Sequence, residues 1–285
     1  MPPQPPPLPP DNHVHSQWSW DADAGSMEAS CARAVELGLR SIAFTEHWDP
    51  TPCPIAPAEL PHLPPDMRSL VSADGIFLPP PLDVDGYLEC VRECRKRFPE
   101  LRIHSGVELG EPHWWPEAFD ALIRHAGFDR ILGSVHCVDV DGRYQYIDGL
   151  YGKRDPHEVI RIYLAEVLRL VESTLPFEVL AHIDYPVRAW PSATAGTYQP
   201  TAFEDEYRTL LRALARSGRI LEINTTVPLH ADIVRWWHQE GGHAVSLGSD
   251  AHEPAQIARG FAGAAAVAEA AGFVGGRRDV AWLQR

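Results

Sequence analysis

Histidine and carboxylate side chains follow short apolar segments at six places in this sequence. The motifs are His-x-His, Thr-Glu-His, Gly-Val-Glu, Gly-Ser-Val-His, Ala-His-Ile-Asp and Gly-Ser-Asp-Ala-His, and they supply His13, His15, His47, Glu108, His136, His182, Asp250 and His252. Each apolar segment is predicted to be a buried strand, and a barrel of parallel strands brings such ends to one face. Imidazole and carboxylate ligands suit Zn, Mn or Fe better than Ca or Mg. We therefore predict a centre of two or three divalent ions, able to activate a hydroxide and to clamp an in-line displacement at phosphorus.

Spacing within the motifs supports this prediction. His13 and His15 lie two residues apart on a strand end, so both face the same side, and the same spacing recurs in the last motif. An isolated His-x-His is more simply explained as two polar loop residues, but recurrence after six segments makes coincidence a poor explanation. Glu46 and Asp184 neighbour predicted ligand histidines, and they are interpreted either as orienting or pocket groups or as plain polar positions.

The elements that would position these motifs alternate between strands and helices. Predicted strands cover 11–15, 41–45, 101–108, 128–136, 177–182, 219–224 and 244–248, and a short eighth element is expected near Val280. Predicted helices cover 26–37, 84–98, 117–125, 155–173, 202–217, 229–240 and 253–271. Repeated strand–helix units favour a closed barrel of parallel strands. An open doubly wound sheet is the alternative, but no Gly-x-Gly-x-x-Gly follows a strand.

Composition narrows the classes of partner. The 285 residues have a formal net charge of -14. Such a surface repels nucleic acid and anionic membranes, but it does not exclude a small anionic metabolite that meets a local cation. No window of about 18 consecutive apolar residues predicts a transmembrane helix. The five cysteines lack zinc-ribbon spacing, which favours reduced thiols and a cytoplasmic location.

One large domain is predicted. It spans 11–285, and a disordered proline-rich tail at 1–10 precedes it. The region at about 48–83 is also rich in proline and directly follows the Thr-Glu-His motif. Because long loops in compact domains are usually functional or disordered, we predict that this region is a lid or a wall of the substrate pocket.

With its motifs in this order, the chain resembles the polymerase-and-histidinol-phosphatase (PHP) superfamily of metal-dependent phosphoesterases. The resemblance extends from residue 11 to residue 252, and the Gly-Ser-Val-His and Ile-Asn-Thr segments are most similar to the histidinol-phosphatase branch. It implies an α/β fold, a distorted (β/α)7 TIM-like barrel, with a trinuclear site at the carboxyl ends of the strands.

The resemblance also implies a role for each motif. When the family's ligands are carried over residue by residue, the first metal would be held by His13, His15, Glu108 and Asp250. Glu108 would bridge to the second metal, which His136 and His182 complete, and the third would be held by His47 and His252. The family often supplies a further histidine to the third metal. Asp21 stands in that place here, so it is predicted to ligate, with Asp23 as the fallback.

Phosphate requires a cationic partner, and the resemblance points to Arg188, where the histidinol-phosphatase branch tends to place a Lys or Arg. A second arginine common after the Asn-Thr segment is missing, since Thr-Val-Pro stands there. The basic residues that could compensate are Arg154, His157, His230 and Arg259.

The predicted function is a metal-dependent phosphomonoesterase acting on a small phosphorylated metabolite. L-histidinol phosphate is the best guess, which would place the protein in histidine biosynthesis. Glu108, Asp250 and His252 are the predicted catalytic residues, and His252 or a metal-bound water would protonate the leaving alkoxide. The alternatives are a phosphoesterase acting on nucleotides or oligonucleotide ends, a non-catalytic metal-binding protein of the same fold, and an amidohydrolase-type barrel. The last usually has a lysine after a middle strand, and no lysine follows a predicted strand here.

Overall fold

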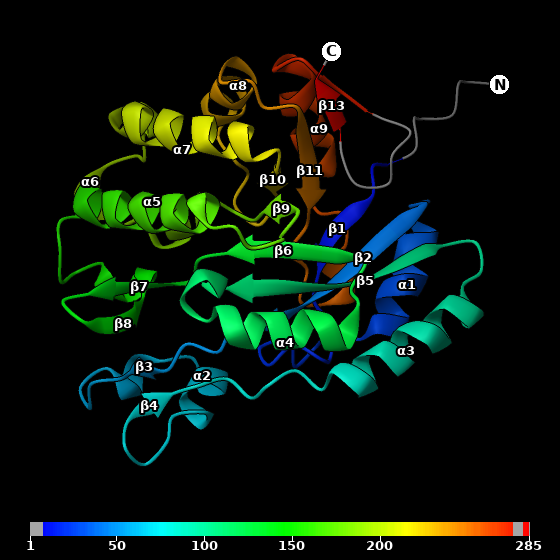
Figure 1. The fold of residues 1–285 in the computed structure, drawn as a ribbon, viewed down its shortest axis with the longest axis horizontal. Helices are drawn as coiled ribbons and strands as arrows, with labels where there is room; N and C mark the ends of the chain where they lie inside the picture. The colour runs from blue at the N-terminus through cyan, green and yellow to red at the C-terminus, as the bar shows by residue number, and fades with distance from the viewer. Residues whose placement is uncertain (1–7, 276–281, 285) are drawn as a thin grey trace.

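Seven parallel strands form a nearly closed barrel at the centre of the computed structural model, which describes residues 8–275 and 282–284 (Figure 1). In sheet order the strands are β1 (Asp11–Val14), β2 (Ser41–Trp48), β5 (Arg102–Gly110), β6 (Arg130–Ser134), β9 (Val179–Leu180), β10 (Ile220–Asn224) and β11 (Ala244–Gly248). Each pairs with the next in parallel register. Their carboxyl ends therefore lie at one end of the barrel.

Backbone contacts between β1 and the segment after β11 close the barrel. The amide of Asp250 donates to the carbonyl of His13, and the amide of His15 donates to that of Ala251, both at 2.8 Å. Val14 and Ala251 form a parallel bridge between these two hydrogen bonds. The first and last ligand motifs therefore lie side by side, and the predicted distorted (β/α)7 barrel is confirmed.

Helices cover the outside of the barrel (Figure 1). The longer ones are α1 (Met27–Glu36), α3 (Val84–Arg97), α4 (Pro116–Ala126), α5 (Pro156–Glu172), α7 (Glu204–Ser217), α8 (Ala231–Gln239) and α9 (Phe261–Ala270). The α5 and α7 helices pack against each other, and their apolar faces share one core with the sheet, through residues such as Tyr163, Leu210 and Leu221. The Ser26 side chain caps α1 by accepting from the amide of Ala29.

Shorter helical turns join these elements. They are η1 (Leu60–His62), α2 (Pro65–Ser69), η2 (Pro112–Trp114), η3 (Ile147–Leu150), η4 (Tyr185–Ala189), α6 (Ser192–Ala195), η5 (Pro200–Phe203) and η6 (Pro254–Gln256). Three of them, α2, η3 and η4, contribute side chains to the cavity described below.

The predicted helix over 253–271 is wrong in its first half. The η6 turn comes first, and α9 starts only after Gly260, whose φ of +73° is a left-handed conformation that glycine adopts without strain. Val280 lies outside the described residues. Nearby, β13 (Trp282–Gln284) pairs antiparallel with both β11 and β12 (Phe273–Val274), so it extends the sheet without adding a parallel strand.

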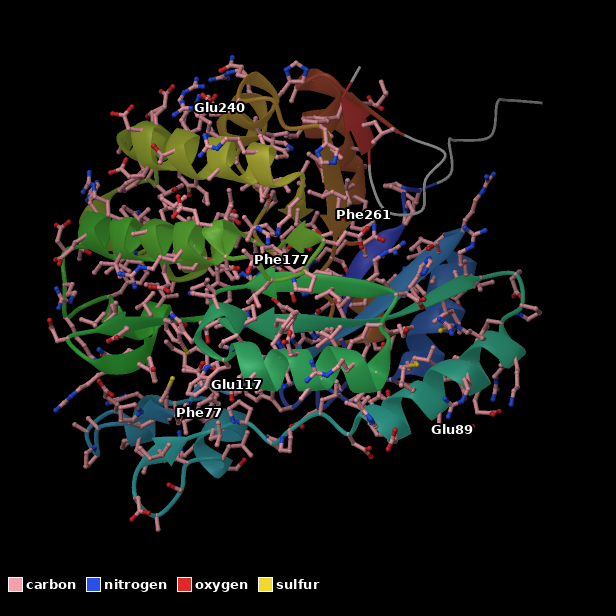
Figure 2. All side chains as sticks on the ribbon, viewed as in Figure 1. Phe77, Glu89, Glu117, Phe177, Glu240 and Phe261 are labelled. Atoms are coloured by element: carbon pink, nitrogen blue, oxygen red, sulfur yellow. The ribbon has the colours of Figure 1, made fainter. Side chains whose placement is uncertain are left out.

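The proline-rich region at 48–83 has structure of its own. It contains the antiparallel pair β3 (Cys53–Pro54) and β4 (Ile76–Phe77), and it packs on the hairpin formed by β7 (Cys137–Val140) and β8 (Arg143–Tyr146). Phe77, labelled in Figure 2, lies edge-on to Trp20 and to Tyr146 at 5.5 and 5.6 Å between ring centroids. The boundaries of the domain and the role of this region as a lid stay predictions, and residues 1–7 of the predicted tail lie outside the described residues.

The cysteine thiols are free, as the sequence predicts. Cys137 follows a predicted ligand, but it is buried, and its sulfur lies 3.3 Å from that of Cys53. No helix of the described ranges is both long enough and apolar enough to cross a membrane.

Candidate metal centre

The residues predicted as metal ligands meet at the carboxyl ends of the strands. Three lie at the ends of β1 and β2, Glu108 lies near the end of β5, and the others follow β6, β9 and β11. Four groups have ligand atoms within 4.8 Å of one another: His15, His47 and His252; His13, His15 and Asp250; His13, Glu108 and His182; and His47, Glu108 and His136. All eight motif residues are therefore brought together by the closed barrel.

Glu108 is fully buried at the centre of this set. Oε1 lies 2.6 Å from Nε2 of His182 and 3.3 Å from Nε2 of His136. Oε2 lies 3.2 Å from both Nε2 of His13 and Nδ1 of His47. No hydrogen bond to Oε2 is formed by the residues that the structure describes. The two oxygens thus face different pairs of imidazoles, which is the arrangement that a carboxylate bridging two cations requires.

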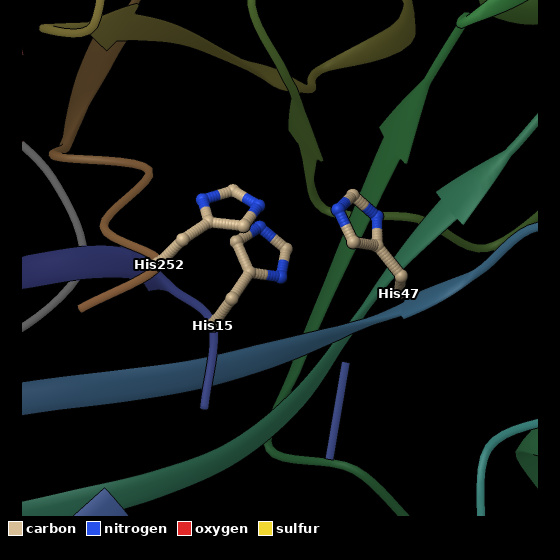
Figure 3. A group of neighbouring side chains, drawn as sticks. All are labelled: His15, His47 and His252. Atoms are coloured by element: carbon tan, nitrogen blue, oxygen red, sulfur yellow. The ribbon is translucent and has the colours of Figure 1, made fainter. Parts of the chain in front are cut away.

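A second group consists of three imidazoles from separate parts of the chain, His15, His47 and His252 (Figure 3). The His15 ring lies 4.1 Å from that of His47 and 4.4 Å from that of His252, centroid to centroid. Asp21 is placed against this group, since Oδ2 is 3.3 Å from Nε2 of His47 and 3.2 Å from Nε2 of His252. Its other oxygen is buried without a hydrogen bond from any described residue. The position predicted for Asp21 from the sequence therefore faces the third ligand group.

Burial and neighbouring charges shift the pKa values of the predicted ligands in opposite directions. Burial and the neighbouring His47 and His252 lower the pKa of His15 to about 3. Burial acts in the same direction on His47, but Asp21 and other carboxylates outweigh it and raise its pKa to about 10. Burial favours a neutral Glu108, yet the surrounding histidines, His13 first, hold its pKa well below the usual range. Closely packed imidazoles around an ionised carboxylate are stabilised by positive charge placed between them. Divalent cations supply that charge while the imidazoles stay unprotonated and able to ligate.

Glu222 on β10 is a group that the sequence-based prediction missed. Its Oε1 lies 2.7 Å from Nδ1 of His13, and its Oε2 accepts from the amide of His182 at 2.9 Å. A Cβ on Gly248 would lie 2.2 Å from Oε1, so the glycine of the last motif leaves the space that Glu222 occupies. By holding Nδ1, Glu222 directs Nε2 of His13 toward the centre. The available signal was a carboxylate in an otherwise apolar strand, two residues before Asn224.

Asp49 does the same for another ligand and was also missed. Its Oδ1 lies 3.0 Å from Nδ1 of His136, and its Oδ2 accepts from Nε1 of Trp20 at 2.9 Å. Gly110 makes room for this carboxylate, because a Cβ there would lie 2.2 Å from Oδ1. Asp49 stands two residues after His47, the spacing that also joins the residues of the His-x-His motif. That spacing is the signal that could have found it.

Of the two residues predicted to orient ligands, Glu46 occupies such a position. Its carboxylate accepts from the hydroxyls of Ser16 and Ser19 at 2.6 and 2.5 Å, and the Ser19 oxygen lies 3.0 Å from Nδ1 of His15. Asp184 is buried and makes no hydrogen bond with another described side chain. Burial raises its pKa to about 7, against the opposing charge of Arg188.

A cavity of about 180 Å³ opens over these ligands. Arg188 is its one arginine or lysine among the described residues, and Nη2 donates to Oδ2 of Asp250 at 2.5 Å. The guanidinium also lies 4.7 Å above the ring of Tyr185. The four residues considered as a second phosphate contact do not line this cavity. The cavity is below the usual range for drug-sized ligands and is suited to a small metabolite.

Comparisons with known proteins agree with this geometry. Residues 11–226 match the family described as PHP domain. The histidinol-phosphatase of Lactococcus lactis subsp. lactis (strain IL1403) is 26% identical over 259 residues, which cover 85% of this chain and 83% of that protein. The probable histidinol-phosphatase of Thermotoga maritima is 26% identical over 261 residues, which cover 88% and 87%.

Two solved structures share the fold. The histidinol phosphate phosphatase of Lactococcus lactis subsp. lactis Il1403, complexed with zinc, L-histidinol and phosphate, matches with a TM-score of 0.77 at 23% identity, over 94% of this chain and 95% of that one. The putative histidinol phosphatase of Listeria monocytogenes matches with a TM-score of 0.69 at 18% identity, over 89% and 99%. Since the family match covers more than half of the sequence and the motif order agrees with it, this chain belongs to the PHP domain family.

Proposed function

We propose that this protein is a metal-dependent phosphomonoesterase whose substrate is L-histidinol phosphate. The observation that supports this most directly is the bridging position of Glu108 between imidazole pairs, directly below a small cavity with one arginine. The names of the curated relatives point to the same activity. Hydrolysis of a phosphate monoester requires an activated water, positioning of the ester and neutralisation of its negative charge. Divalent ions held by these residues would supply these together with Arg188.

Two or three divalent ions, drawn from Zn, Mn and Fe, are proposed for the centre. The donors fit them: they are imidazole and carboxylate atoms within 4.8 Å of one another, and two buried carboxylate oxygens there have no hydrogen-bond donor among the described residues. The four ligand groups described above would hold the ions, with Asp21 completing the group at His252. When bound, such ions lower the pKa of water and neutralise charge on phosphoryl oxygens.

The residues of the chain position the substrate. Arg188 already gives one N–H to Asp250, so its remaining donors are available to phosphate oxygens. His252 lines the same cavity with 29% of its side chain exposed, and Asp21 lies beside its Nε2. Nδ1 of His252 lies 3.0 Å from the carbonyl of Asp250, so Nε2 would be its ligand atom and would carry no proton. The proton for the leaving alkoxide is therefore proposed to come from a water at the centre.

A metabolite screen tests the proposal. The protein is stripped with a chelator, reconstituted separately with Zn, Mn and Fe, and assayed against phosphate monoesters while bound metal is measured by elemental analysis. We expect no turnover in the stripped protein and recovery with at least one metal, with kcat/KM highest for L-histidinol phosphate. Activity confined to nucleotides would replace the substrate, and metal binding without turnover of any ester would leave a non-catalytic metal-binding protein.

Replacing Arg188 with methionine should raise KM for the phosphate ester by about ten- to a hundredfold, the range expected for loss of charge-assisted hydrogen bonds. Methionine keeps apolar contact with Tyr185 while removing the charge. Steady-state kinetics would measure the change. Arg154→Met is the matched control, because Arg154 pairs with Asp141 and Glu158 outside the cavity. An equal effect of both substitutions would remove Arg188 from the phosphate site.

A further inference from the structure

One carboxylate in the cavity has no side-chain partner among the described residues. Five carboxylates line it, namely Asp21, Asp49, Glu108, Asp148 and Asp250. Four of them form ion pairs or hydrogen bonds with histidines, Trp20 or Arg188, as described above. The side chain of Asp148 has neither with any residue that the structure describes. The carboxylate of Asp148 is therefore the one in the cavity that pairs with no described histidine, tryptophan or arginine.

Asp148 has a fixed place relative to the metal centre. It lies in η3, whose first residue, Ile147, is buried and donates its amide to the carbonyl of His136 at 3.0 Å. The carbonyl of Asp148 in turn accepts from the amide of Tyr151 at 3.2 Å. The exposed carboxylate is thus carried by a hydrogen-bonded turn whose first residue is tied to the backbone of the predicted metal ligand His136.

The neighbours of Asp148 suit an organic cation. Tyr146, Tyr185 and Met67 line the same cavity. The Tyr185 ring lies 5.1 Å from that of His136 between centroids, so this aromatic side of the cavity adjoins the metal centre. An anion beside neutral aromatic rings attracts ammonium and imidazolium groups both by charge and through the ring faces.

We propose that Asp148 binds the cationic group of the substrate, which makes it a specificity-determining residue for phosphate esters that carry an ammonium group near the ester. This inference rests on the proposed function and names the substrate class more closely. The phosphate is drawn to Arg188 and the metal centre, while the amine is drawn to Asp148, and all of these groups line the same cavity. Esters with additional negative charge, such as nucleoside polyphosphates, are disfavoured by the same carboxylate.

Paired ligands test this independently of turnover. Binding of L-histidinol and of its analogue without the amine is measured by calorimetry on metal-loaded protein, for the unchanged chain, Asp148→Asn and Asp139→Asn. Asp139 is an exposed carboxylate on β7 that does not line the cavity, so it controls for net charge. Asp148→Asn should weaken L-histidinol binding about five- to tenfold and leave the analogue unchanged, and Asp139→Asn should change neither.

Kinetics provide the second measurement. For L-histidinol phosphate, Asp148→Asn should raise KM about five- to tenfold with kcat within twofold, while KM for phenyl phosphate stays the same. Equal shifts for both ligands of a pair, no shift for L-histidinol, or no binding of L-histidinol to the unchanged protein would each overturn the role of Asp148. Selective loss of amine binding in a protein that hydrolyses no ester would instead support the role of Asp148 and overturn the proposed phosphatase activity.

Discussion

Replacing Glu108 with glutamine is expected to lower phosphatase turnover by about a hundredfold or more and to reduce the bound metal per chain. The reason is the geometry of the two carboxylate oxygens. Oε1 faces His182 and His136, whereas Oε2 faces His13 and His47. Glutamine keeps the shape but offers one oxygen and one amide nitrogen, and the amide donates hydrogen bonds and does not ligate. The glutamine side chain can therefore place a ligating oxygen toward only one of the two imidazole pairs.

Three measurements separate this effect from misfolding. Turnover and metal content are compared in metal-replete buffer, and thermal unfolding of the chelator-treated protein is followed in parallel. Glu117→Gln on α4, a surface position visible in Figure 2, is the matched control and should leave all three unchanged. Near-wild-type turnover of Glu108→Gln with full metal content would contradict a bridging role.

The strands and the ligand set could be predicted because they depend on local patterns. A buried strand is a short apolar run, and a side chain directly after it must lie at the carboxyl end of a parallel barrel. That rule placed the eight motif residues at one end without any knowledge of how the strands are ordered. Asp21 does not follow a strand, and its position was inferred from the family resemblance alone.

The groups that orient the ligands are harder to predict from the sequence, because they contact ligands that lie far away along the chain. Glu222 and His13 are 209 residues apart, and no motif of either strand requires the other. What joins them is the close approach of β10 and β11 to β1 on closure of the barrel. The error at 253–271 has a different cause. The alanine-rich sequence favours a helix throughout. The barrel-closing contact at Ala251 and the left-handed turn at Gly260 nevertheless delay the start of that helix.

Replacing Gly248 with alanine should weaken metal binding about ten- to a hundredfold, although residue 248 touches no metal. The added Cβ would lie 2.2 Å from Oε1 of Glu222 and 2.5 Å from Cβ of His13, so both must move. Displacing Glu222 removes the group that holds Nδ1 of His13 and the amide of His182 at once. The expected loss is therefore in metal affinity, measured by competition with a chelator of known affinity, and it should exceed the loss of stability seen in the metal-free protein.

A second glycine gives the matched control for this substitution. A Cβ on Gly263, within α9, has no atom within 4 Å, so alanine there should leave metal affinity unchanged and stabilise the helix by about 0.5–1 kcal/mol. Glu222→Gln separates displacement from charge, because the amide oxygen can still accept from His13 and should retain more affinity than Gly248→Ala does. If Gly248→Ala binds metal within twofold of the unchanged protein, Glu222 does not orient the ligands and the space at Gly248 serves packing alone.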